Sequence, residues 1–476
     1  MLGRTPLKIE LRGKMNRGIK LFDLVVPEEN LHPFFKRVRV AETSIAAREM
    51  LEEVFQSFED PDGNFVEQFQ TSGFDARFFE LYLHAYFSRS GYSVDRRFPN
   101  PDFIVGLKGM RVAVEATTVN PSTSGMIAKY GRKIEDLDEA ELRDYARDEL
   151  PIRFGSALYS KMQKAYWQKQ QCAGLPFVIA VQAFHDEGSL RFSDTALVEY
   201  AYGSRQSACW SPEGDLLISN ANVESHSLGE KAIPSGFFDQ SDAEHISALI
   251  FSNSGTHAKF SRMGYQSGFG TDVLKIQRFG RSFNESPDAM DAVLFQYDMD
   301  DPPQVEPWGQ GLTIIHNPKA NIQLPDGFFV HAKEHHLRGD YVTTTPGGWH
   351  PFNSQTLLTY VAELKSLPNA NFLLGHGPRA IGSIHKDHFW SFEPQMDLDG
   401  EEDGWYSDEF QAFLGLILRR KVDWKAVVLA RDYYFRFFPI ANISSISSRA
   451  SAVAAVQHRM MEFLGSPRRL FDKSVG

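Results

Sequence analysis

The sequence predicts an α/β protein in which helices flank a mixed sheet, and three observations indicate this class. Residues 74–90 and 152–171 have the apolar spacing of helices. Between them, PDFIVGL and MRVAVEATTV adjoin Lys108–Gly109, which is typical of a β-hairpin. The nearly all-apolar run at 175–184 is typical of a strand that is buried on both faces.

The other elements are predicted in chain order from the same patterns. Residues 1–40 are expected to form strands and loops, and 41–58 an amphipathic helix that ends at the turn Asp60–Gly63. Gly91 ends the helix at 74–90. Further along we expect a helix at 193–203, a strand at 246–254, short strands between Gly- and Pro-containing turns at 260–350, and helices at 353–366, 408–420 and 446–464.

Composition and charge restrict the class of function. The net charge of −11 argues against a protein that coats nucleic acid nonspecifically, although it leaves room for one basic cleft. No apolar run reaches the roughly 18 residues that span a bilayer, and the N-terminus lacks the apolar core of a signal peptide. Cys172 and Cys209 stand in no metal-binding spacing. We therefore expect a cytoplasmic protein that does not bind a membrane.

The hairpin brings two acidic residues together. If Lys108–Gly109 is a two-residue turn, the register pairs Leu107 with Met110 and Asp102 with Glu115. Directly opposed residues point to the same side of a sheet, and like charges in such a pair are destabilising. A divalent cation held between the two carboxylates would remove that repulsion, and Mg²⁺ prefers such oxygen ligands. Thr117 projects from the same side.

A third acid, Glu80, lies in the middle of the very aromatic helix at 74–90. A glutamate in apolar surroundings is rarely buried without a partner. His84 lies one turn further along the same helix face and is a candidate partner. A structural salt bridge from Glu80 to an arginine is an equally good interpretation.

Glu80 on a helix, Pro101–Asp102, and Glu115–Ala116–Thr117 on the next strand together resemble the PD-(D/E)xK nuclease superfamily. The resemblance covers roughly 110 residues and implies a restriction-endonuclease-like core with Tyr92–Phe98 as the first strand of its meander. It also implies that Asp102 and Glu115 hold Mg²⁺ or Mn²⁺, with Glu80 as a possible further ligand.

The sequence departs from the family at one position. The family places a lysine two residues after the second acid, where Thr117 stands here. Variants of the family supply this cation from a neighbouring helix, which makes Lys161 the candidate catalytic lysine, with Thr117 lining the site. By the same resemblance, nucleic acid is expected to contact basic and polar residues near the motif and on the crossover helix, namely Arg96, Arg97, Arg153, Ser156 and Lys164.

The resemblance implies a divalent-metal-dependent nuclease that acts on DNA, or less favourably on RNA, in restriction or phage defence. An inactive fold of this type that binds nucleic acid or protein remains an alternative, as does an unrelated α/β interaction protein. Self-association or a partner protein stays open. The predicted organisation is an N-terminal segment packed on the core (1–60), the nuclease-like core (61–260), a β-rich extension (261–352) and a mainly helical C-terminal region (353–476).

Four histidines form a second cluster in the sequence: His331, His335, His336 and His350. Their spacing allows two imidazoles to lie one helical turn apart, as some zinc sites require. The Gly and Pro residues around them favour a loop instead. Loop histidines without a shared role are therefore the preferred interpretation.

Overall fold

A computed structural model describes residues 20–122, 125–186, 188–211, 216–271, 274–282, 292–360, 401–407, 413–431 and 437–464. The chain divides into two compact units. The large unit comprises Met1–Asp272, Ile276–Val293 and Asp298–Leu357, and the small unit Val273–Lys275, Leu294–Tyr297 and Leu358–Gly476. Each unit is considered by itself.

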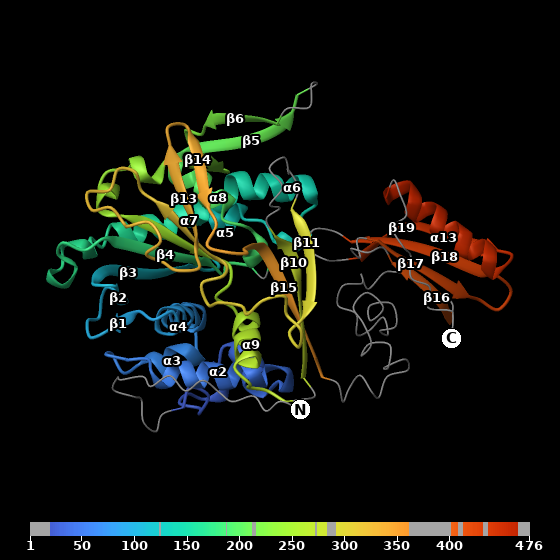
Figure 1. Cartoon of the computed structure of the whole chain (residues 1–476), viewed down its shortest axis with the longest axis horizontal. Coiled ribbons are helices and arrows are strands. Elements are labelled where there is room, and N and C mark those ends of the chain that lie inside the picture. The colour runs from blue at the N-terminus through green and yellow to red at the C-terminus, as the bar shows by residue number, and fades with distance from the viewer. Residues whose placement is uncertain are drawn as a thin grey trace. The chain divides into compact units, whose positions relative to one another are not determined.

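A mixed sheet of eight strands forms the centre of the large unit, which confirms the predicted α/β class (Figure 1). The first three strands form an antiparallel meander, β3 and β4 are parallel, and β4 is parallel to β9. Strand β12 is antiparallel to β9 and parallel to β13, and β13 is antiparallel to β14. In spatial order the strands are β1 (Ser93–Asp95), β2 (Phe103–Leu107), β3 (Met110–Val119), β4 (Phe177–Ala183), β9 (Ala248–Ser252), β12 (Leu312–His316), β13 (Lys333–Arg338) and β14 (Tyr341–Thr345).

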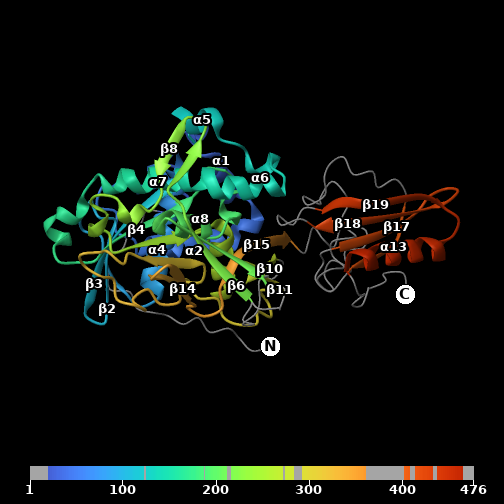
Figure 2. The ribbon, with the colours of Figure 1, turned by 90° about the horizontal axis from the view of Figure 1, so that it is seen from above.

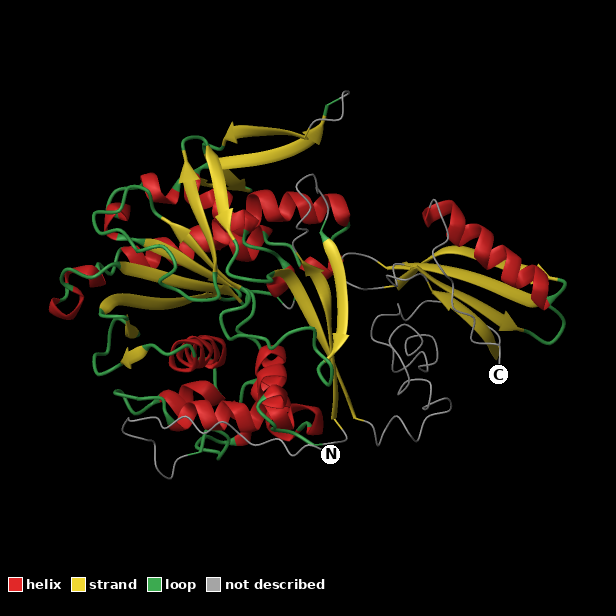
Figure 3. Cartoon of the chain, in the orientation of Figure 1, coloured by secondary structure: helices red, strands yellow, loops and turns green. Residues whose placement is uncertain are grey.

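Helices cover both faces of this sheet (Figure 3). On one face, α4 (Phe74–Arg89) belongs to a single apolar core with α2 (Ile45–Gln56) and with Phe103, Val105, Val112 and Val114 of the hairpin. The apolar face of the hairpin therefore packs on this core. The other face carries α7 (Leu150–Met162) and α8 (Thr195–Tyr202). We call these the α4 face and the α7 face. Near α4 lie α1 (Pro33–Val40), α3 (Phe65–Gln70) and α9 (His257–Gln266).

The crossover helix starts earlier and ends earlier than predicted. It runs without a break from α6 (Glu139–Asp144) through one π-helical turn (Tyr145–Glu149) into α7, as Figure 2 shows. Asp138 begins it with a capping box to Glu141. It ends at Met162, because Ala165 adopts a left-handed conformation with φ 49° and short 3-10 turns follow.

Several elements differ from the sequence-based expectations. Residues 33–40 form α1, with Pro33 in its first turn, where a strand or loop was expected. Helix α9 begins at the hydroxyl cap of Thr256 within a stretch expected to form strands. The predicted helix at 353–366 is wrong for residues 353–360, which belong to β15 (Pro351–Tyr360); residues 361–366 lie outside the described residues. Strand β15 forms a three-stranded sheet with β10 (Leu274–Ser282) and β11 (Val293–Asp298).

Shorter elements complete the large unit. Helix α5 (Gly125–Tyr130) precedes the crossover helix, and two hairpins follow α8. One pairs β5 (Ser204–Trp210) with β6 (Leu216–Asn222), and the other pairs β7 (Ser225–Leu228) with β8 (Lys231–Pro234). Three of the eight central strands, β12 to β14, come from residues 261–352.

The small unit is a four-stranded antiparallel sheet with one helix packed on it. Its strands are β16 (Glu401–Ser407), β17 (Phe413–Arg419), β18 (Trp424–Arg431) and β19 (Phe437–Ile446). The prediction of a mainly helical region is therefore wrong for the described residues, whereas the helix predicted at 446–464 is confirmed as α13 (Arg449–Leu464). The apolar run FLGLILR fits either structure locally, and pairing with β18 decides for the strand. In neither unit is a described helix both long and apolar enough for a membrane span.

Candidate functional site

The β2–β3 hairpin has the register that its sequence predicts. Lys108 and Gly109 form the turn with φ angles of 49° and 83°, the left-handed pair that a two-residue hairpin turn requires. Leu107 therefore pairs with Met110, and Phe103 with Val114. Asp102 and Glu115 are the next residues of the two strands, away from the turn. They therefore lie at the same end of the hairpin, on the α7 face.

The two acids are joined through each other's backbone. The N–H of Asp102 donates a hydrogen bond to Oε2 of Glu115 at 3.2 Å. The N–H of Ala116 donates to Oδ2 of Asp102 at 2.7 Å. Glu115 is buried and Asp102 is half-buried. The backbone thus holds both carboxylates at one place, with Asp102 on the more exposed side.

Lys161 supplies a cation to this pair from the crossover helix. Its Nζ lies 2.5 Å from Oε1 of Glu115, and its side chain is 27% exposed where that of Glu115 is 4% exposed. Thr117, two residues beyond Glu115 on β3, is half-buried on the same side of the strand. The structure thus puts a lysine beside the second acid, although the sequence has a threonine at the family's lysine position.

The pKa values of Glu115 and Lys161 are both raised above their usual ranges. Burial and the neighbouring Asp102 raise the pKa of Glu115 to about 8, against the opposing effect of Lys161. Burial acts to lower the pKa of Lys161, but Glu115 and Asp102 outweigh it and raise that pKa. The charge of Asp102 contributes to both shifts, whereas burial, the largest effect on each group, raises the pKa of Glu115 and opposes the rise in the pKa of Lys161. A further cation at this place would oppose both shifts.

The charge of Asp102 acts on Glu80, but the carboxylate of Glu80 forms ion pairs with two arginines. Arg77 Nη1 lies 2.6 Å from one oxygen of Glu80, and Arg96 Nη2 lies 3.3 Å from the other. Burial and Asp102 raise the pKa of Glu80, and the two arginines oppose that rise. His84, the other candidate partner, contacts Ser57 Oγ at 3.0 Å. The salt-bridge interpretation of Glu80 therefore holds in this structure.

The expected nucleic-acid contacts separate into buried and exposed residues. Arg96 is only 7% exposed and lies over the rings of Phe58 and Phe103, at 3.8 and 4.5 Å from their centroids. It is therefore not presented to a nucleic acid. Arg97 is 73% exposed and pairs with Asp95. One of the two neighbouring arginines thus stabilises the core, and the other reaches the surface.

The three crossover-helix residues expected to contact nucleic acid differ in exposure, because Arg153 is buried whereas Ser156 and Lys164 are exposed. Arg153 is buried and its Nη2 lies 2.6 Å from Oε1 of Glu149. The Ser156 hydroxyl donates to the carbonyl of Ile152. Both residues lie in the middle of the continuous helix, so neither is near its positively polarised N-terminus at Asp138. Lys164 is exposed just beyond the end of the helix.

A surface hollow of about 410 Å³ adjoins the hairpin at the β1 edge of the sheet. Arg97 and Arg111 line it, together with Asp95 and Ile104. The register places Arg111 on the same side of β3 as Glu115, four residues nearer to the turn. Arg111 was not predicted as a site residue. Arg111 lies an even number of positions from Glu115 and Thr117 along β3, so the sequence could have placed all three on one face of the strand.

The four histidines singled out in the sequence do not all lie together, and His335 and His336 belong to β13, where a loop was expected. His331 is exposed, whereas His335 Nε2 lies 3.1 Å from Asp194 Oδ2. His350 is buried near Lys333, Asp194 and His335. His336 belongs to a different group, which the sequence analysis did not predict. The described residues contain two clusters of carboxylates and histidines that could hold a metal ion. One is His316, Asp326, Glu334 and His336, and another is Asp242, Glu244 and His245, each with ligand atoms within 4.8 Å of one another.

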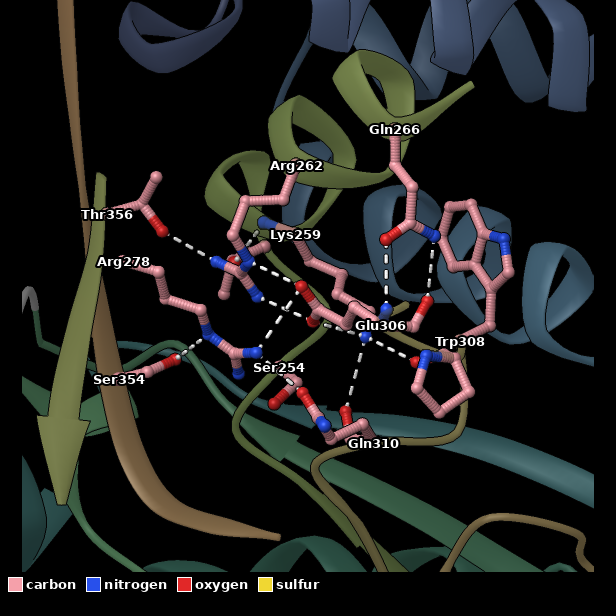
Figure 4. A network of polar contacts seen from close by, with 12 residues as sticks. Ser254, Lys259, Arg262, Gln266, Arg278, Glu306, Trp308, Gln310, Ser354 and Thr356 are labelled. Carbon is pink, nitrogen blue, oxygen red and sulfur yellow. Dashed lines mark hydrogen bonds and ion pairs between the residues drawn. The ribbon is translucent and has the colours of Figure 1, made fainter. Parts of the chain in front are cut away.

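A further charged group, the Glu306 network, surrounds one buried acid with three buried cations (Figure 4). Lys259 Nζ lies 2.7 Å from Oε1 of Glu306, Arg262 Nε lies 2.8 Å from Oε2, and Arg278 Nη1 lies 3.3 Å from Oε2. Arg262 also donates to Thr356 at 2.6 Å. The cations hold the pKa of Glu306 well below its usual range despite its burial. This network joins α9 to the strands beside it.

Comparison of the chain with models of protein families, with curated proteins and with solved structures found no match.

Proposed function

We propose that this protein is a divalent-metal-dependent hydrolase of phosphodiester bonds in nucleic acid, with DNA favoured over RNA. The observation that carries the proposal is the position of Lys161, whose Nζ lies 2.5 Å from Glu115 within the Asp102–Glu115 pair. The resemblance to PD-(D/E)xK nucleases requires a cation at this place. A lysine from the crossover helix meets that requirement where Thr117 does not.

The donor set fits a hard divalent cation such as Mg²⁺ or Mn²⁺. Asp102 and Glu115 would hold the ion through carboxylate oxygens, and Mg²⁺ commonly takes one or two carboxylates and completes its shell with water and phosphate oxygens. Glu80 is not part of this set, because both of its oxygens are engaged by arginines. When bound, the ion would lower the pKa of an attacking water and offset the charge of the phosphate.

The chain's own groups have separate tasks in this proposal. Lys161 is the cation that faces the negative charge developing on the phosphate, and it is partly exposed on the side of the site. The backbone N–H groups of Asp102 and Ala116 fix the two carboxylates, so neither acid has to be ordered when substrate arrives. Arg97 and Arg111 face the adjoining hollow and would contact the nucleic-acid backbone.

A second candidate is an inactive fold of the same type that binds nucleic acid or a protein. One observation favours it, namely the charge balance of the site. Asp102, Glu115 and Glu80 carry three negative charges when ionised. The neighbouring cations Lys161, Arg96 and Arg77 carry three positive charges. A metal ion is therefore not needed to make this region neutral.

Cleavage assays of the purified full chain distinguish the two candidates. Single-stranded and double-stranded DNA and RNA are incubated with Mg²⁺ or Mn²⁺, with EDTA as the blank. We expect metal-dependent cleavage that Asp102→Asn reduces by roughly 10²–10³-fold, because one of two ion ligands is lost. Asp340→Asn, at an exposed carboxyl in the turn after β13, is the matched control and should cleave like the native chain.

Two results would contradict the proposal. Cleavage that survives Asp102→Asn would remove the reaction from this site. A native chain that cleaves none of the substrates, while it still binds one of them in the same buffer, would favour the inactive fold.

A further inference from the structure

A second cluster of ligand-type side chains lies on the same sheet as the proposed catalytic site but on its other face. Strands β12 and β13 are parallel, and Ile314 pairs with Glu334. Ile314 belongs to the core of the α4 face, so His316, Glu334 and His336 point to that face as well. Glu115 alternates with the core residues Val114 and Ala116 and points to the α7 face. The two sites therefore cannot share one ion.

The cluster has the spacing of a metal site that is slightly open. Glu334 Oε2 lies 3.6 Å from His316 Nε2 and 3.8 Å from His336 Nε2. His336 Nε2 lies 3.7 Å from Asp326 Oδ1. Ligands at about 2.1 Å around a tetrahedral ion are separated by roughly 3.4 Å. These three separations would have to shorten by a few tenths of an ångström, and the remaining pairs, all within 4.8 Å, by up to about 1.4 Å, to bring the four ligand atoms onto one ion.

Ordinary hydrogen bonding does not explain the arrangement. All three separations exceed the range in which an N–H···O bond forms. The side chain of His316 is 6% exposed, and its Nε2 is buried without a hydrogen-bond partner among the described residues. A buried polar atom in that condition destabilises the fold. His316 Nε2 is directed at the Glu334 carboxylate and would be satisfied by a metal ion between them.

The surroundings hold the ligands in place. Glu334 Oε1 accepts the N–H of Gly327 at 2.9 Å, which leaves Oε2 on the side of the histidines. Gly327 follows Asp326, so the same hydrogen bond fixes the loop that carries the fourth ligand. Asp326 is 69% exposed and His336 is 17% exposed, so the cluster opens to solvent on the Asp326 side. An ion can enter there without unfolding the strands.

We propose that His316, Asp326, Glu334 and His336 bind one divalent transition-metal ion of the zinc class. Two imidazoles favour such an ion over Mg²⁺, which takes oxygen ligands. Four protein ligands leave no open position in a tetrahedral shell, so the ion has a structural role. It ties the 317–332 loop to strands β12 and β13. The rings of His316 and His336, now stacked at 4.1 Å, would tilt apart around it.

The test is a titration of the metal-free full chain with Zn²⁺ in competition with a chromophoric chelator. We expect one tight equivalent that millimolar Mg²⁺ does not displace, and a visible absorption spectrum when Co²⁺ replaces Zn²⁺. Asp326→Asn and His336→Gln should each weaken that equivalent by at least about tenfold. Asp326 is exposed, so its variant will fold even if His336→Gln does not.

Two controls locate the ion. His331→Asn changes an exposed histidine of the same loop, in a left-handed conformation that asparagine also adopts, and should leave Zn²⁺ affinity unchanged. Asp102→Asn should also leave it unchanged, which separates this site from the proposed catalytic one. The proposal is overturned if the native chain takes up no tight equivalent, or if Asp326→Asn binds Zn²⁺ as the native chain does.

Discussion

The Glu306 network and the Asp102–Glu115–Lys161 site both bury charge in the large unit, but they balance it in opposite ways. Around Glu306, three cations face one acid. Burial lowers the pKa of Lys259 to about 7, and the charge of Glu306 offsets only part of this effect. Around Lys161, two acids face one cation, and the pKa of Glu115 rises to about 8. The first region is sealed, whereas the second is partly exposed. An acid surplus at an accessible place is what an incoming cation requires.

The largest effect should come from removing the acid at the centre of the Glu306 network. Glu306→Gln leaves three buried cations without their shared counter-charge, and we expect a loss of roughly 3–5 kcal/mol in unfolding free energy. Urea unfolding followed by circular dichroism measures it. Glu230→Gln, at an exposed turn, is the matched control. Equal losses in the two variants would mean that the network contributes no stability.

Lys161→Met should reduce cleavage strongly and change stability little, whereas Glu306→Gln should mainly reduce stability. We expect cleavage to fall by roughly 10²–10³-fold, because the charge beside the phosphate is lost. Stability should change by no more than about 1 kcal/mol, because Glu115 already binds a proton readily at neutral pH. Lys319→Met, at an exposed lysine, is the control for both readouts. A large loss of stability with intact cleavage would make Lys161 a structural residue.

The pH dependence of stability provides an intermediate effect. Because burial lowers the pKa of Lys259 from 10.5 to about 7 in the folded chain, the unfolded chain binds more protons between these values. The contribution of Lys259 to stability should therefore rise with pH through that window, by as much as about 1.4 kcal/mol per unit. Lys259→Met should lack this rise when urea midpoints are compared at pH 7, 8 and 9. Parallel curves for the two proteins would show an ordinary lysine.

The smallest effects should come from the exposed arginines of the hollow. Arg97→Ala and Arg111→Ala should leave the urea midpoint unchanged, because both side chains are more than half exposed. If each contacts a phosphate, its loss should lower the slope of log affinity against log salt by about 0.9. Fluorescence anisotropy with labelled DNA measures this slope. Slopes equal to that of the native chain would exclude both residues from the interface.

The sequence was sufficient where one local rule determined the geometry. The Lys108–Gly109 turn set the hairpin register, and the register placed Asp102 beside Glu115. The missing lysine position directed attention to Lys161, which the structure puts beside Glu115. In each case neighbouring residues or a single crossover fixed the answer.

Prediction failed where a distant partner decided the outcome. The sequence left the partner of Glu80 open between His84 and an arginine, and one of the two arginines that engage it, Arg96, comes from beyond the next strand. His316 reaches His336 because β12 and β13 are parallel, which the separation of the two residues in the chain does not reveal. The strand β17 reads locally as a helix until β16 and β18 pair with it.

The tip of the β2–β3 hairpin restricts both residue type and length. Lys108 is exposed, but its left-handed φ angle favours glycine, asparagine or aspartate as a replacement. One inserted residue would rotate every later position of β3 to the opposite face and send Glu115 into the phenylalanine core. The spacing of the acids is thus controlled from the far end of the hairpin, by two residues that take no part in the chemistry.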